Sequence, residues 1–167
     1  MRETINRLHY IFTGEPLSER REDDPNIGTR ITTGELAGVT FIPGIDGNGE
    51  QIIPSDAYPH IVIEPLREIE INSLFKRVVL VMDCAVKVPG RFSALFGRAR
   101  GLSIMDFVSG VRRVLKSNHT LRMAGTPWAT QYSIDSIEYS LGTSERGNGV
   151  GRRFATITVT YHVPVEQ

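Results

Sequence analysis

Hydrophobic and polar residues alternate most clearly between residues 75 and 88. One set of alternate positions is apolar throughout and comprises Val78, Leu80, Met82, Cys84, Val86 and Val88. Because successive side chains in a strand point to opposite faces, this spacing predicts a long strand with one face in the core. Val79 and Val81 lie on the second face, which indicates a central strand covered at least in part on both sides.

The C-terminal third predicts two more strands, over residues 132–141 and 154–163, joined in a long hairpin by the glycine-rich sequence GTSERGNGVG. One face of the last strand carries Ala155, Ile157, Val159, Tyr161 and Val163. The other face carries Thr156, Thr158, Thr160 and His162. We expect the first face to pack on the core and the threonine face to meet water or another protein.

Apolar residues spaced three and four apart predict two helices. The clearer one follows Ser103, a good N-cap, and its apolar stripe comprises Ile104, Phe107, Val108, Val111, Val114 and Leu115. Arg112, Arg113 and Lys116 face away from that stripe. A shorter stripe near the N-terminus comprises Ile5, Leu8, His9 and Phe12, and Gly14 and Pro16 end it.

One more strand is predicted over residues 58–64, ended by Pro65. The order helix, strand, strand, helix, strand, strand favours an α+β fold: a mainly antiparallel or mixed sheet with two helices packed on one face. A chain of 167 residues is about one domain long. We therefore expect residues 1–167 to form a single domain whose core sheet and main helix lie in residues 58–163.

Residues 14–58 interrupt this pattern, because turn-forming residues stop every apolar run before it reaches helix length. We expect a long loop or β-ribbon insertion, in which residues 37–42 pair with residues 51–53. Residues 18–25, of mixed charge and without an apolar anchor, are expected to be solvated. A connection of this length is usually functional or mobile.

Composition narrows the function classes. Lysine and arginine together number 19, as do aspartate and glutamate, so the formal net charge is zero. This balance excludes a strongly basic nucleic-acid module that binds through bulk charge. The single cysteine excludes an internal disulfide framework and a cysteine-based zinc site. No apolar stretch approaches the roughly 18–20 residues of a membrane span. We expect a soluble protein without membrane contact.

The sequence contains few patterns typical of phosphate-binding, metal-binding or catalytic sites. The segments GIDGNG and GNGVG open no predicted helix, so we interpret them as turns and not as phosphate cradles. The four histidines have no metal-binding spacing, and Cys84 is expected to be a small core residue. These patterns predict no cofactor, no metal and no catalysis.

Asp83 is the most notable carboxylate, because it interrupts the second apolar face of the central strand. We expect it to pair with a cation, for which Lys76, Arg77 and Lys87 are the candidates, or to lie exposed near the strand end. An alternative reading is a small hydrolase or nuclease in which Asp83 acts with Glu64 or His60.

The loop between the central strand and the main helix, PGRFSALFGRARG, is basic and aromatic without any acid. Its notable residues are Arg91, Phe92, Leu95, Phe96, Arg98 and Arg100. Such a composition is found in nucleic-acid contacts, but apolar residues in a long connection need burial, which another subunit can supply. We favour a protein interface over a nucleic-acid-binding module.

From residue 58 to residue 163 the chain resembles the tail terminator, or tail completion, proteins of long-tailed bacteriophages. An N-terminal amphipathic helix precedes the similar region. The region itself contains YPHIVIEP, FKRVVLVMDCAVKV, the helix SIMDFVSGVRRVLKSN, and the closing strands YSIDSIEYSL and RRFATITVTYHV. The resemblance implies a virion protein, assembled in the host cytoplasm, that forms a ring of copies of itself, usually six. That ring stops growth of the tail tube and offers the surface that the head or neck binds.

The resemblance also suggests roles for residues. The interface candidates are Arg91, Phe92, Leu95, Phe96, Thr156, Thr158 and Thr160. If the ring surrounds a DNA passage, Arg98 and Arg100 are candidates to line it through weak, sequence-independent contacts. The expected partners are further copies of the chain, the tail tube protein, a head-completion or neck protein, and passing DNA. A head-side neck or connector ring protein is an alternative.

Overall fold

The structure, a computed structural model, describes residues 1–17, 28–44, 58–89, 103–141 and 150–166. Its elements are α1 (Arg2–Thr13), β1 (Thr29–Arg30), β2 (Thr40–Pro43), β3 (His60–Glu70), β4 (Phe75–Pro89), α3 (Ile104–Ser117), β5 (Gln131–Leu141) and β6 (Val150–Pro164). The expected α+β class is confirmed. Both helices and the long strands lie where the hydrophobic pattern predicts them.

The described strands form one six-stranded sheet in the order β1-β2-β3-β4-β6-β5. Neighbouring strands run antiparallel except β2 and β3, which are parallel, so the sheet is mixed. β4 and β5 both pair antiparallel with β6, which lies between them. The connection through α3 therefore joins two strands that point the same way without being neighbours.

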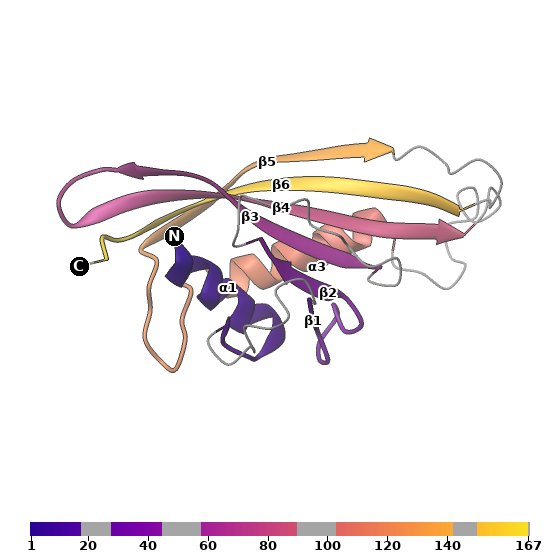
Figure 1. Cartoon of the computed structure of the whole chain (residues 1–167), viewed down its shortest axis with the longest axis horizontal. Coiled ribbons are helices and arrows are strands. Elements are labelled where there is room, and N and C mark those ends of the chain that lie inside the picture. Colours follow the sequence, from indigo (N-terminus) through magenta and orange to yellow (C-terminus); the bar gives the residue numbers. More distant parts are fainter. Residues whose placement is uncertain (18–27, 45–57, 90–102, 142–149, 167) are drawn as a thin grey trace.

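Both helices cover the same face of the sheet (Figure 1), as expected. Beneath them lies the apolar face predicted from the alternation in β4, together with the matching face of β6. Leu80, Met82 and Cys84 are fully buried there, as are Ile157 and Val159. The hydrophobic core is thus a single layer between the helices and the sheet.

The helix ends match their sequence signals. The Ser103 side chain accepts a hydrogen bond of 3.1 Å from the backbone N–H of Asp106 at the start of α3. α1 ends at Gly14, which has a φ of 80° and donates its backbone N–H to the Tyr10 carbonyl. Glycine adopts this left-handed conformation without strain, which explains why the helix stops there.

The predicted end of β3 at Pro65 is wrong. The strand continues to Glu70, with an irregularity in its pairing to β4 between Pro65 and Arg67. Proline is tolerated because β2 pairs only with residues 60–63, so the outer edge of β3 has no described partner at Pro65. The missing N–H therefore breaks no ladder hydrogen bond on that side.

The insertion is described only in part. The extended piece expected over residues 37–42 is confirmed only in part: the strand β2 covers residues 40–43, and residues 37–39 lie outside it. β2 pairs with β1 on one side and β3 on the other. The expected partner, residues 51–53, and the segment 18–25 lie outside the described residues.

Candidate functional site

The sheet face away from the helices carries the threonines of β6. Thr156, Thr158 and Thr160 lie opposite Asp83, Val81 and Val79 of β4, respectively. Thr156 and Thr158 are half-buried, whereas Thr160 is only 6% exposed. Burial of Val79 on this face confirms that the central strand is covered in part on both sides.

Two of these threonines donate hydrogen bonds to carboxylates. The Thr156 hydroxyl donates to Asp83 Oδ1 over 2.7 Å, and the Thr160 hydroxyl donates to Asp135 Oδ2. Ser133 donates to the other oxygen of Asp135. These bonds form two separate groups, one between β4 and β6 and one between β6 and β5, so a partner on this face would meet side chains that are already hydrogen-bonded. The interface role of Thr156, Thr158 and Thr160 stays a prediction.

Two of the three expected cations, Lys76 and Arg77, bond other residues, and the pairing expected with Lys87 stays a prediction. Lys76 lies at the hairpin end of β4 and bonds Glu68, and Arg77 donates to His162. Asp83 is instead half-buried in the middle of the strand and held by Thr156. Sequence reasoning missed this partner because the register between β4 and β6 decides it.

The same face also carries Asp83, Glu64 and His60, the residues of the alternative hydrolase or nuclease interpretation. Asp83 lies opposite Val62 of β3, and His60 and Glu64 are two residues away on either side of Val62. His60 is buried and Glu64 is exposed. Among the described residues, no group of three or more histidine, cysteine, aspartate or glutamate side chains is placed to hold a metal ion.

An aromatic and cationic cluster lies beside His60. The Tyr58 and His60 rings are 4.6 Å apart. The Lys87 ammonium and the Arg152 guanidinium lie 4.8 Å and 5.6 Å from the centre of the Tyr58 ring. Such cation–π contacts stabilise the residues where β3, β4 and β6 meet.

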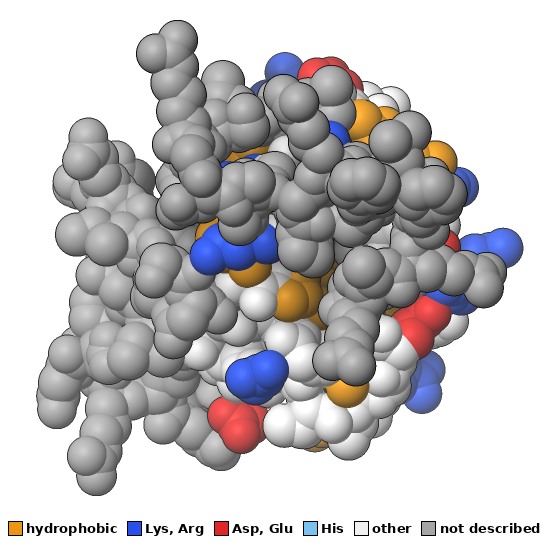
Figure 2. Space-filling model, turned by 90° about the vertical axis from the view of Figure 1, so that its right-hand side faces the viewer, with side chains coloured by type: hydrophobic (Ala, Val, Ile, Leu, Met, Phe, Trp, Pro, Cys, Tyr) orange, Lys and Arg blue, Asp and Glu red, His pale blue; other side chains and the backbone are white. Residues whose placement is uncertain are grey.

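The basic loop named as an interface candidate lies outside the described residues. This applies to Arg91, Phe92, Leu95, Phe96, Arg98 and Arg100. Their roles stay predictions. Figure 2 views the molecule from its right-hand side in Figure 1, where the described surface carries side chains of both charges with hydrophobic ones between them.

Sequence reasoning missed the hairpin that joins β3 to β4. It projects from the left of the molecule in Figure 1, and every described residue from Glu64 to Leu74 is exposed. Four of the six exposed large hydrophobic residues in the described chain lie on it: Leu66 (58%), Ile69 (38%), Ile71 (46%) and Leu74 (63%). Apolar residues alternate with acids in this segment, and that pattern could have predicted the hairpin. A strand that ends at Pro65 leaves these residues out.

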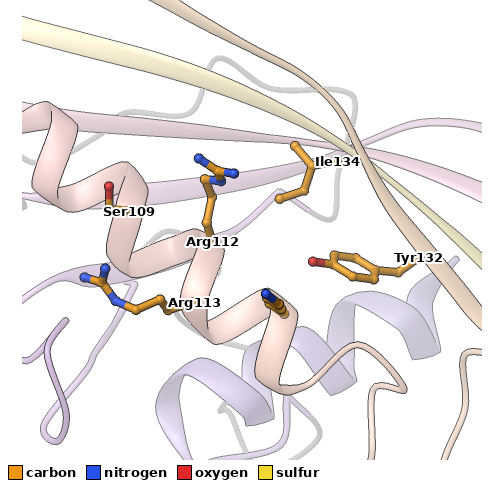
Figure 3. A pocket seen from close by; sticks show the side chains of 6 residues that line it. Ser109, Arg112, Arg113, Tyr132 and Ile134 are labelled. Atoms are coloured by element: carbon orange, nitrogen blue, oxygen red, sulfur yellow. The ribbon is translucent and has the colours of Figure 1, made fainter.

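Sequence reasoning also missed a pocket between α3 and β5 (Figure 3). It encloses about 240 Å³ and is lined by Ser109, Arg112, Arg113, Lys116, Tyr132 and Ile134. Arg112 extends from the helix toward the strand, and Tyr132 and Ile134 point back toward the helix. The sequence pattern places Arg112, Arg113 and Lys116 on the outward face of the helix. In the structure they line one side of the pocket, and Tyr132 and Ile134 line the other side.

Arg113 forms a bidentate ion pair with Glu35. Its Nε and Nη2 atoms donate to the two carboxylate oxygens of Glu35 over 2.8 Å and 2.5 Å. The hydrogen bonds from Arg113 lower the pKa of Glu35, and the same bonds raise the pKa of Arg113. Neither Arg112 nor Lys116 forms an ion pair with any described residue. The described residues consequently leave these two positive charges of the pocket uncompensated.

The Glu35 loop is fixed against α3 by packing as well as by charge. Leu36 is buried and lies over Gly110, so close that a Cβ on Gly110 would come within 2.8 Å of the Leu36 Cδ2 atom. Glycine at this position lets the loop approach the helix. The loop thereby holds Arg113 in place beside the pocket.

The sequence matches no protein-family model, and no curated protein matches it significantly. Among the described helices, none has the length and apolar character needed to cross a membrane.

Proposed function

We propose that this protein is a structural subunit of a bacteriophage virion, a tail terminator that assembles as a ring on the head-proximal end of the tail tube. In this role it stops tube growth and presents the surface that the head or neck binds. It acts through subunit–subunit and subunit–tube contacts and without catalysis.

One observation carries the proposal: exposed hydrophobic side chains are concentrated on a projecting hairpin. Leu66, Ile69, Ile71 and Leu74 lie close together in the chain, on a segment where the outer edge of β3 has no described strand partner. Exposed apolar side chains that lie close together are typical of surfaces that bind another protein. A subunit of a closed assembly needs such surfaces.

Zero net charge agrees with this proposal, because little self-repulsion opposes the packing of copies against one another. The threonine face of β6 and the basic loop containing Arg98 and Arg100 supply further candidate contacts, with the tube, with a neighbouring subunit or with passing DNA. Contacts with DNA are expected to be weak and independent of sequence, because DNA must slide through the ring.

Electron microscopy of tails assembled with and without the protein tests the proposal. Tubes assembled without it are expected to exceed the normal length, and adding the purified protein is expected to restore that length and cap one end. Tubes of normal length in its absence would overturn the terminator role. Cross-linking to the portal but not to the tube protein would assign the subunit to the head side instead.

A further inference from the structure

Two surfaces of the protein have no partner among the residues that the structure describes. One is the hairpin tip, residues 69–74, which joins β3 to β4. The other is the helix–strand pocket between α3 and β5, lined by Ser109, Arg112, Arg113, Lys116, Tyr132 and Ile134. We infer that the hairpin tip of one copy docks in the helix–strand pocket of the next copy. This inference rests on the proposed function only in that the chain assembles with itself.

The hairpin tip combines apolar side chains with an acid. Ile71 and Leu74 are 46% and 63% exposed. Glu70, beside them, is exposed and forms no ion pair with a described residue. The tip is also well defined, because the Asn72 side chain accepts hydrogen bonds of 2.9 Å from the backbone N–H groups of Leu74 and Phe75. A pre-ordered tip loses little conformational entropy on docking.

The helix–strand pocket has the matching composition. Tyr132 and Ile134 offer an apolar wall, and Arg112 and Lys116 offer positive charge that no described acid neutralises. Its volume of about 240 Å³ lies below the roughly 300–1,000 Å³ of small-molecule sites. The pocket is therefore better sized for side chains of a protein segment than for a free ligand.

Charge and polarity are complementary between the two surfaces. Docking would bring Ile71 and Leu74 against Tyr132 and Ile134, and the Glu70 carboxylate toward Arg112 and Lys116. An acid placed between two cations suppresses wrong partners and fixes the orientation of the contact. The segment that docks in the pocket thus belongs to a second copy of this chain, because every copy carries the complementary tip.

The positions of the two surfaces make the contact directional. β5 forms one edge of the described sheet, whereas the hairpin part of β3 has no described strand partner at the opposite edge. One copy cannot fill its own pocket with its own tip across the width of the sheet. Tip-to-pocket contacts consequently join copies head to tail, and such an interface gives a ring when the rotation closes.

Two variants that each damage one surface test this inference. In Leu74→Asp the tip gains a charge where the apolar wall must be met, and in Arg112→Glu the pocket repels Glu70. Each variant alone is expected to weaken self-association at least about tenfold in analytical ultracentrifugation, because both residues lie at the centre of the contact. Met105→Asp and Arg122→Glu are matched controls, since both residues are exposed and lie outside the two surfaces.

Mixing the two variants gives the decisive result. A Leu74→Asp copy keeps an intact pocket, and an Arg112→Glu copy keeps an intact tip, so the mixture is expected to form a one-to-one dimer and nothing larger. A mixture that stays monomeric would overturn the inference. Circular dichroism spectra equal to that of the unmodified chain verify that both variants are folded.

The remaining outcomes separate this inference from the proposed function. If both variants assemble as well as the unmodified chain, the tip-to-pocket contact is wrong while self-assembly stands. If the unmodified chain remains monomeric at millimolar concentration, the contact is also wrong. The terminator role is judged independently, by tube length in the electron microscope.

Discussion

The Thr156 hydroxyl donates a hydrogen bond of 2.7 Å to the Asp83 carboxylate, across the adjacent strands β6 and β4. The two residues are direct register partners, so their side chains leave the same face of the sheet side by side. An acid in a largely apolar central strand is costly unless it is hydrogen-bonded. Thr156 supplies that hydrogen bond.

Replacing Thr156 with valine is expected to destabilise the protein. The substitution keeps the branched shape that suits a strand but leaves half-buried Asp83 without its hydroxyl donor. The free energy of unfolding should fall by about 1–3 kcal/mol. Thr158→Val is the control, because it makes the same change beside Val81, and its effect should be much smaller. Chemical denaturation measures both, and equal losses would contradict the assigned role of Thr156.

The Glu35–Arg113 pair predicts a pH effect. The hydrogen bonds from Arg113 hold the pKa of Glu35 below its ordinary value of 4.5. A carboxyl whose pKa is lowered by folding stabilises the folded state above its unfolded pKa, and that contribution is lost as the pH falls through the folded pKa. An NMR titration of the Glu35 carboxyl should therefore give a pKa below 4.5.

Removing the guanidinium tests that cause. In Arg113→Gln the Glu35 pKa should rise toward 4.5, whereas Arg112→Gln should leave it unchanged, because Arg112 makes no described bond to Glu35. Both side chains of the pair are largely exposed, so the accompanying change in stability should be small. A Glu35 pKa that responds equally to both substitutions would show that general surface charge, and not the bidentate pair, sets it.

Replacing Tyr161 with phenylalanine is expected to stabilise the protein. The Tyr161 hydroxyl is buried in the core and has no hydrogen-bond partner among the described residues. Because a buried unpaired hydroxyl costs about 1–3 kcal/mol, its removal should raise the free energy of unfolding by about 1 kcal/mol. Tyr132→Phe, in the ring stacked 5.9 Å away, is the control and should have little effect. A loss of stability in Tyr161→Phe would reveal a partner for the hydroxyl.

The single cysteine should report on unfolding. Cys84 is fully buried in the middle of β4, and burial, together with the negative charge of Asp83, raises the pKa of its thiol. The reactive thiolate is therefore scarce and shielded in the folded protein. A thiol reagent should react with one group per chain in denaturant and far more slowly without it. Rapid labelling of the folded protein would contradict the placement of Cys84 in the core.

Local patterns were sufficient to predict most of the fold. The stripe of α3 and the alternation in β4 and β6 each determine which side chains face a common core, and the structure buries those faces. Ser103 and Gly14 marked helix ends because their roles depend only on neighbouring backbone atoms. Such features are readable from a sequence because the interactions involved span a few residues.

The pocket between α3 and β5, the partner of Asp83 and the exposed edge of β3 depend on contacts between segments far apart in the chain. Arg112 and Tyr132 share a pocket only because β5 lies at the sheet edge beneath α3, and no spacing in the sequence encodes that placement. The partner of Asp83 depends on the register between β4 and β6. The sequence predicts a strand end at Pro65 because proline disrupts a paired strand, and only the sheet order reveals that the outer edge of β3 has no described partner there.

That same proline has a protective consequence. A long, flat, apolar outer strand is a template on which further chains add without limit and precipitate as fibrils. In β3, Pro65 offers no N–H and the adjoining irregularity distorts the backbone up to Arg67, which also adds a like-charge barrier between identical strands. Copies of the chain are thus hindered from adding to one another along this strand, while the turn beyond it stays accessible.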